Sequence, residues 1–143
     1  MKPIKPMKKS ITETIIQYFA PDRHVIAVYL FGSQARGRAK PSSDVDLAVL
    51  LAEKPDFDYR LKAMDELSGL LKKPVDVVIL DQCGLIMQRQ VLKYGILLYE
   101  RDSRKRKAFE ILSRKMYLDF LPAHRLYVSK MEERILRRVE NGR

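Results

Sequence analysis

The chain has 143 residues, is 46% hydrophobic and 32% charged, and carries a formal net charge of +10, which is typical of one globular domain with a modest core. Its single cysteine, Cys83, excludes an internal disulfide, and its two histidines lack the ligand-spaced partners of a zinc site. No apolar run approaches the ~18 residues of a membrane span, and no signal-peptide pattern follows the basic N-terminus, so we expect a cytoplasmic protein.

The first expected element is a helix that begins near Ser10 and ends before Pro21. Its opening residues, Ser-Ile-Thr-Glu, resemble a capping box, in which serine and glutamate side chains satisfy free backbone N–H groups. Apolar residues recur behind it at helical spacing and predict one buried face. They are Ile11, Ile15, Tyr18 and Phe19.

An apolar run over residues 25–31 predicts a buried strand that leads directly into Gly32 and Ser33. Good helix formers follow, so a short helix should begin at Ser33, ahead of a polar loop over residues 37–43. Backbone N–H groups at a helix start bind phosphate, Gly32 permits close approach, and Ser33 adds a hydroxyl donor. Arg36 could contact a phosphate bidentately or could form a surface or structural ion pair.

Two carboxylates, Asp44 and Asp46, begin the next expected strand, over residues 44–51. Side chains two apart in a strand point to the same face, so these two should lie side by side. Two bare carboxylates ~4 Å apart repel by about 4 kcal/mol at an effective dielectric constant of 20, and a divalent cation offsets that cost. Few, hard oxygen ligands suit Mg²⁺, which prefers one or two carboxylates together with substrate phosphates.

A third carboxylate, Asp76, is the only charged residue in a β-branched run over residues 74–80, which predicts another strand. An unpaired charge in such a run is costly. If this strand lies beside the Asp46 strand, Asp76 completes a three-carboxylate cluster; alternatively, it ends the strand at the surface. An amphipathic helix is expected between the two strands, over residues 58–72. Its predicted apolar face consists of Leu61, Met64, Leu67, Leu70 and Leu71.

The remaining residues predict a helix over 85–93, a short strand at a sheet edge over 96–99, and a basic tail. Residues 101–143 contain 13 Lys and Arg against 6 Asp and Glu. Two amphipathic helices broken near Pro122 are expected there. We therefore divide the chain into a core, 1–100, and a basic helical extension, 101–143, that packs on the core or on a partner.

Three ordered motifs resemble those of the nucleotidyltransferase superfamily that includes DNA polymerase β: Phe31-Gly32-Ser33, Asp44-Val45-Asp46-Leu47 and Val75-Asp76-Val77. The stretch over about residues 25–80 resembles the minimal nucleotidyltransferases in particular, the MntA-type antitoxins encoded with HEPN-domain toxins. The resemblance implies an α/β fold, with a small mixed sheet, flanking helices and a C-terminal helical extension.

These residues predict a site for a nucleoside triphosphate with Mg²⁺. Gly32 and Ser33 would hold the β- and γ-phosphates, Asp44 and Asp46 the metal that carries them, and Asp46 and Asp76 a second metal at the acceptor hydroxyl. Asp76 is also a candidate to accept the hydroxyl proton. The resemblance implies AMP transfer from ATP to a tyrosine hydroxyl of a HEPN ribonuclease toxin, which silences the toxin.

Two other functions remain open from the sequence. A non-catalytic antitoxin would neutralise its partner by forming a complex, and a small-molecule nucleotidyltransferase of the aminoglycoside-modifying kind would need a second domain or a dimer to complete its cleft. The basic tail keeps nucleic acid as a weaker alternative partner. The last helix suggests a protein partner or a homo-oligomer.

Overall fold

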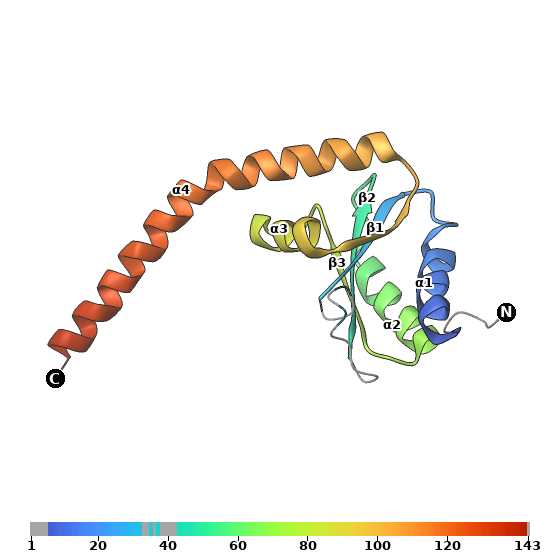
Figure 1. Ribbon diagram of the computed structural model, residues 1–143, viewed down its shortest axis with the longest axis horizontal. Coiled ribbons are helices and arrows are strands. Elements are labelled where there is room, and N and C mark those ends of the chain that lie inside the picture. Colours follow the sequence, from blue (N-terminus) through green and yellow to red (C-terminus); the bar gives the residue numbers. More distant parts are fainter. Residues whose placement is uncertain (1–5, 33–34, 36, 38–42, 143) are drawn as a thin grey trace.

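A mixed sheet with helices on both faces forms the body of the protein (Figure 1). The structure, a computed structural model, describes residues 6–32, 35, 37 and 43–142. Its elements in chain order are α1 (Pro6–Phe19), β1 (Val25–Phe31), β2 (Val45–Leu51), α2 (Tyr59–Leu71), β3 (Val75–Ile79), α3 (Leu85–Tyr94), β4 (Ile96–Glu100) and α4 (Ser103–Asn141). The predicted short helix that begins at Ser33 lies outside the described residues.

The described strands run in the order β3-β2-β1-β4. β1 pairs antiparallel with both β2 and β4, whereas β2 and β3 are parallel because α2 crosses over between them. The Asp46 strand and the Asp76 strand are therefore neighbours, as the sequence suggested, and Asp46 and Asp76 are register partners. The predicted edge position of the last strand is also confirmed, since β4 is the outermost strand beside β1.

The sheet separates two apolar layers. On one face α1 and α2 cover the strands, and on the other α3 and the first half of α4 do so (Figure 1). The first layer includes the fully buried side chains of Ile15, Phe19, Leu47, Leu67 and Val77. The second includes Tyr29, Ala48, Leu50, Leu80 and Val91. Residues of β2 and β3 alternate between the layers, as the two-residue period of a strand requires, whereas in β1 a register irregularity places the neighbours Ile26 and Ala27 in the same layer.

The first helix begins at Pro6, earlier than the expected start near Ser10. Proline is well tolerated in the first turn of a helix, where its missing N–H would have no partner in the helix. The predicted apolar face is confirmed: Ile15 and Phe19 are buried, and Ile11 and Tyr18 pack against the same layer.

The buried face of α2 agrees with the predicted one in part. Leu67 is buried and Met64 and Leu71 pack against the same layer, whereas Leu61 and Leu70 are each 58% exposed and the buried Ala63 was not predicted. The stripe that meets the sheet runs through residues spaced four apart, and the small Ala63 side chain lets the helix approach the strands closely. A count of apolar residues alone could not distinguish this stripe from the neighbouring leucines.

The basic tail forms one helix rather than two. α4 continues through Pro122, and Figure 1 shows it changing direction partway along. Proline removes one backbone hydrogen bond and clashes with the preceding turn, which bends a helix, but the helix formers on either side continue it here. Asp102 caps the start, where its side chain accepts a hydrogen bond of 3.0 Å from the Lys105 N–H. In the described part of the chain no helix is long and apolar enough to cross a membrane.

Candidate active site

The three predicted carboxylates lie where β2 and β3 begin. Asp46 and Asp76 are the second residues of their strands, and because they are register partners in adjacent parallel strands, their side chains emerge on the same face of the sheet. This is the face that α3 and α4 cover further along the strands. Asp44 precedes β2 by one residue and is exposed.

The environment of Asp46 disfavours its charged form. Partial burial raises the pKa of this carboxyl above its ordinary value, and the negative charges of Asp76 and Asp44 raise it further. Both neighbouring carboxylates therefore act on Asp46 at short range. A bound divalent cation would favour ionised Asp46 and reverse this effect.

The turn after β1 lies directly against Asp46. Phe31, the last residue of β1, pairs with Asp46 across the β1–β2 ladder, and Gly32 follows with φ of +74°. A Cβ atom on Gly32 would lie 2.3 Å from the Asp46 Oδ2 atom, which is closer than atoms can approach. Glycine is therefore required here for its lack of a side chain as well as for its left-handed backbone.

Sequence reasoning missed Arg60, at the start of α2. Its Nη2 atom lies 3.2 Å from the Asp76 Oδ1 atom, and its Nε–H donates to the Val77 carbonyl on the outer edge of β3. The side chain thus neutralises the third carboxylate while it satisfies an edge carbonyl. The cost of leaving Asp76 unpaired was a signal that a cation should lie nearby, but no sequence spacing pointed to this residue.

Two predicted phosphate contacts, Ser33 and Arg36, lie outside the described residues. Among the described residues no three His, Cys, Asp or Glu side chains are grouped closely enough to hold a metal ion by themselves. The observed arrangement, with Asp46 and Asp76 in register at the start of adjacent strands and Asp76 in contact with Arg60, fits Mg²⁺ held jointly by protein carboxylates and nucleotide phosphates.

A family model described as "Polymerase beta, Nucleotidyltransferase" matches residues 13–104, the segment that contains the turn and all three carboxylates. The chain belongs to this nucleotidyltransferase family. The resemblance inferred from the motifs is thereby confirmed, and the mixed sheet with flanking helices is a polymerase β-like nucleotidyltransferase fold with a long C-terminal helix.

Similar proteins were found among curated sequences and solved structures. The chain is 35% identical over 68 residues to the protein adenylyltransferase MntA of Shewanella oneidensis, a match that covers 48% of this chain and 49% of that protein. The chain thus spans about half the length of the curated relatives that it matches first.

Two solved structures match over most of the chain. A toxin–antitoxin crystallised with AMP-PNP has a TM-score of 0.77 and 24% identity, over 85% of this chain and 98% of that one. A complex of tri-AMPylated Shewanella oneidensis HEPN toxin with MNT antitoxin has a TM-score of 0.72 and 21% identity, over 88% and 98%. At these sequence identities the similarity shows a shared fold and nothing more.

Proposed function

We propose that this nucleotidyltransferase is a Mg²⁺-dependent protein adenylyltransferase that moves AMP from ATP to a tyrosine hydroxyl of a HEPN ribonuclease toxin and so acts as its antitoxin. The observation that carries the proposal is the contact of the Gly32 turn with Asp46, which has Asp76 as its register partner. The MntA relative and the fold match to an antitoxin in complex with an AMPylated toxin support the acceptor class. ATP use and the single cysteine favour a cytoplasmic location.

The proposed roles follow from where the residues lie. The Gly32 backbone, with Ser33 and Arg36, binds the triphosphate, and the missing side chain at Gly32 lets the phosphates approach Asp46. Asp44 and Asp46 would hold one Mg²⁺, and Asp46 and Asp76 a second. Bound Mg²⁺ neutralises phosphate charge and lowers the pKa of the acceptor hydroxyl.

Asp76 has a second proposed role, as acceptor of the tyrosine proton. In this arrangement the tyrosine oxygen forms a bond to the α-phosphorus, the bond to the β-phosphate bridging oxygen breaks, and pyrophosphate leaves. Arg60 contacts the Asp76 Oδ1 atom and therefore orients the carboxylate. Most of the rate enhancement would come from positioning and electrostatics.

The decisive experiment is intact mass spectrometry of the partner. The purified chain is incubated with the protein encoded beside it, ATP and Mg²⁺, in parallel with Asp44→Ala, Asp46→Ala and the control Asp65→Ala, whose aspartate is exposed on α2. We expect the partner to gain mass in AMP units with the native chain and with the control. Neither variant of the candidate site should produce a gain.

Other outcomes favour the alternatives. A stable complex without a mass gain would contradict catalysis and support neutralisation by binding. A gain that persists in both Asp44→Ala and Asp46→Ala would overturn the site assignment. If the partner neither binds nor gains mass, the acceptor class is wrong, and small hydroxylated molecules and RNA become the substrates to test.

A further inference from the structure

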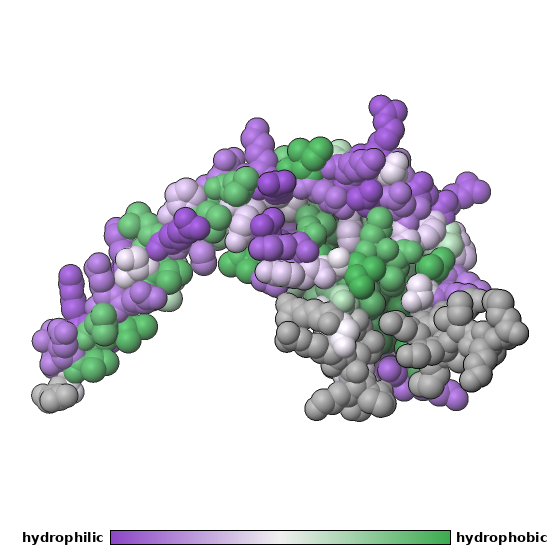
Figure 2. Space-filling model, viewed as in Figure 1, coloured by the Kyte–Doolittle hydropathy of each residue, from purple (hydrophilic) through white to green (hydrophobic). Residues whose placement is uncertain are grey.

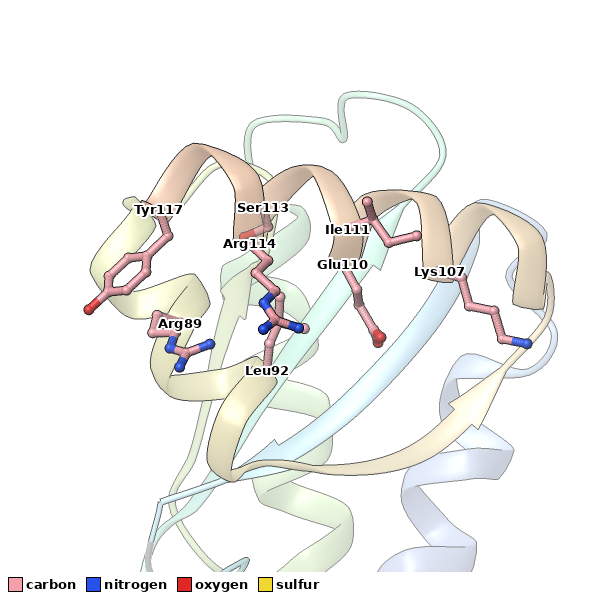
Figure 3. A pocket seen from close by; sticks show the side chains of 8 residues that line it. All are labelled: Arg89, Leu92, Lys107, Glu110, Ile111, Ser113, Arg114 and Tyr117. Carbon is pink, nitrogen blue, oxygen red and sulfur yellow. The ribbon is translucent and has the colours of Figure 1, made fainter. Parts of the chain in front are cut away.

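A pocket of about 370 Å³ lies between α3 and the first half of α4, separate from the three carboxylates (Figure 3). Its volume is at the lower end of the range found for small-molecule sites, which is roughly 300–1,000 Å³. Each helix contributes to the walls of the pocket with residues three or four positions apart, which lie on one face of the helix. The lining residues are Arg89 and Leu92 of α3 and Lys107, Glu110, Ile111, Ser113, Arg114 and Tyr117 of α4.

The pocket is rich in unpaired positive charge. In the described part of the chain no carboxylate forms an ion pair with Arg89, Lys107 or Arg114. The one acidic lining residue, Glu110, is already engaged: its Oε2 atom accepts hydrogen bonds from the Tyr29 hydroxyl at 2.6 Å and from Arg106 at 2.8 Å. Arg89 and Arg114, whose side chains extend toward each other (Figure 3), repel one another, and a bound anion would offset that cost.

The pocket also has an aromatic and apolar wall. The Arg89 guanidinium carbon lies 5.3 Å from the centre of the Tyr117 ring, and Figure 3 shows the Arg89 and Arg114 side chains extending toward each other beside Leu92. Guanidinium groups bind phosphate oxygens through two parallel hydrogen bonds, and an aromatic ring offers a face for a planar base.

A buried polar link joins the two helices that form the pocket. The Ser113 hydroxyl donates to the Gln88 Oε1 atom at 2.6 Å, and the Gln88 amide donates to the Cys83 carbonyl at 3.1 Å. Both Ser113 and Gln88 are buried, so this link fixes α4 on α3. The cations are therefore brought together by the packing of the helices, before any ligand binds.

We propose that this pocket binds a mononucleotide, with its phosphate on Arg89 and Arg114 and its base against Tyr117 and Leu92. Lys107 adds a third positive charge at one end. The site is distinct from the proposed catalytic site and needs no metal, because its own cations offset the phosphate charge. Its occupancy does not depend on whether the chain transfers AMP.

Isothermal titration calorimetry in EDTA tests the proposal, since EDTA removes the metal that the catalytic site would need to hold phosphates. AMP and inorganic phosphate are titrated into the native chain, an Arg89→Gln/Arg114→Gln variant and an Arg134→Gln/Arg137→Gln control. The control lowers the net charge equally, at exposed positions in the second half of α4. We expect the pocket variant to bind AMP at least about tenfold more weakly than the native chain, and the control to be unchanged.

The two ligands distinguish a nucleotide from a simple anion. Tighter binding of AMP than of phosphate, with the difference lost in Tyr117→Ala, would support the base contact. Equal affinity for both ligands would overturn the nucleotide assignment. No binding to the native chain, or equal weakening in the pocket variant and the control, would overturn the site. If the double variant does not fold, Arg114→Gln alone serves, because Arg114 is exposed.

Discussion

The surroundings of Asp46 in the candidate site lower the stability of the folded chain at neutral pH. Its pKa is raised in the folded state by burial and by the charges of Asp76 and Asp44. The folded chain therefore binds a proton at this carboxyl more tightly than the unfolded chain, whose aspartates have a pKa of about 3.9. Stability must fall as the pH rises above that value, and at neutral pH ionised Asp46 destabilises the fold.

Asp46→Asn should consequently separate stability from activity. The amide keeps the shape of the side chain and removes the charge, so we expect a higher melting temperature at pH 7, together with loss of AMP transfer. Below pH 4 the gain in stability should vanish, because the native carboxyl is then protonated as well. Thermal melts at both pH values check this, with Asp65→Asn as the control. A lower melting temperature at pH 7 would show that the carboxylate stabilises the fold.

Gly32→Ala should lower both the stability of the fold and the activity of the candidate site. The added Cβ would meet the Asp46 Oδ2 atom at 2.3 Å, on a backbone with φ of +74°. The left-handed backbone alone should cost about 1–2 kcal/mol of unfolding free energy, and the displaced carboxylate should lower transfer. Urea unfolding and the transfer assay measure the two effects.

Gly69→Ala is the matched control for that substitution. Gly69 lies within α2, and a Cβ atom added there would meet no atom within 4 Å beyond its own stretch of helix, so alanine should stabilise the chain by about 0.5–1 kcal/mol. If both alanines had the same effect on stability and transfer, the argument from the Asp46 contact would be wrong.

Among the elements, α4 is joined to the sheet through Tyr29 of β1. The Tyr29 hydroxyl donates to Glu110 at 2.6 Å, and Glu110 in turn pairs with Arg106. Burial and this hydrogen bond raise the pKa of Tyr29 above its ordinary range. The unfolded chain therefore loses this proton first as the pH rises, and the contribution of the bond to stability declines above pH ~10.

Tyr29→Phe removes that bond and leaves the packing of the ring in place. We expect a loss of about 1–2 kcal/mol in unfolding free energy at pH 7, since Glu110 loses a partner in a half-buried setting. Urea unfolding measures the loss. The control Tyr127→Phe alters an exposed tyrosine of α4 and should change the free energy by less than about 0.5 kcal/mol. Equal effects would contradict a docking role for Tyr29.

Local patterns predicted most of the elements because each strand here is a short apolar run. The sequence predicted a three-carboxylate cluster on the condition that the Asp46 and Asp76 strands are neighbours, but their register could not be predicted, because it depends on how α2 crosses over between them. Arg60 was not predicted, because its contact with Asp76 depends on how α2 crosses the edge of β3 and leaves no periodic trace in the sequence. The continuity of α4 through Pro122 depends on the helix formers around that residue, which outweigh a proline signal that usually ends a helix.

At the scale of the whole molecule, the second half of α4 extends beyond the domain and exposes apolar side chains (Figure 2). The most exposed are Leu126, Tyr127, Ile135, Leu136 and Val139. Because these groups are not buried in the chain, their removal should cost the domain little. The pocket residues of α4 and the Tyr29–Glu110 bond all belong to the first half of the helix.

Deletion of residues 125–143 should therefore change the unfolding free energy by less than about 1 kcal/mol. A longer deletion, of residues 108–143, removes Glu110 and Ser113 and should destabilise the chain much more. Urea unfolding of the two truncated chains beside the native one makes the comparison. A large loss from the shorter deletion would mean that the second half of α4 supports the domain.

The length of α4 also affects the hydrodynamic size of the protein. Its 39 residues extend ~58 Å along the helix at 1.5 Å per residue, whereas a compact chain of this size has a radius of gyration of only about 14–15 Å. The elongated molecule experiences more friction than a sphere of equal mass. On a column calibrated with globular standards, a single 16.7 kDa chain would elute early, at the position of a larger particle. Light scattering, which reports mass independently of shape, would distinguish such a monomer from a true dimer.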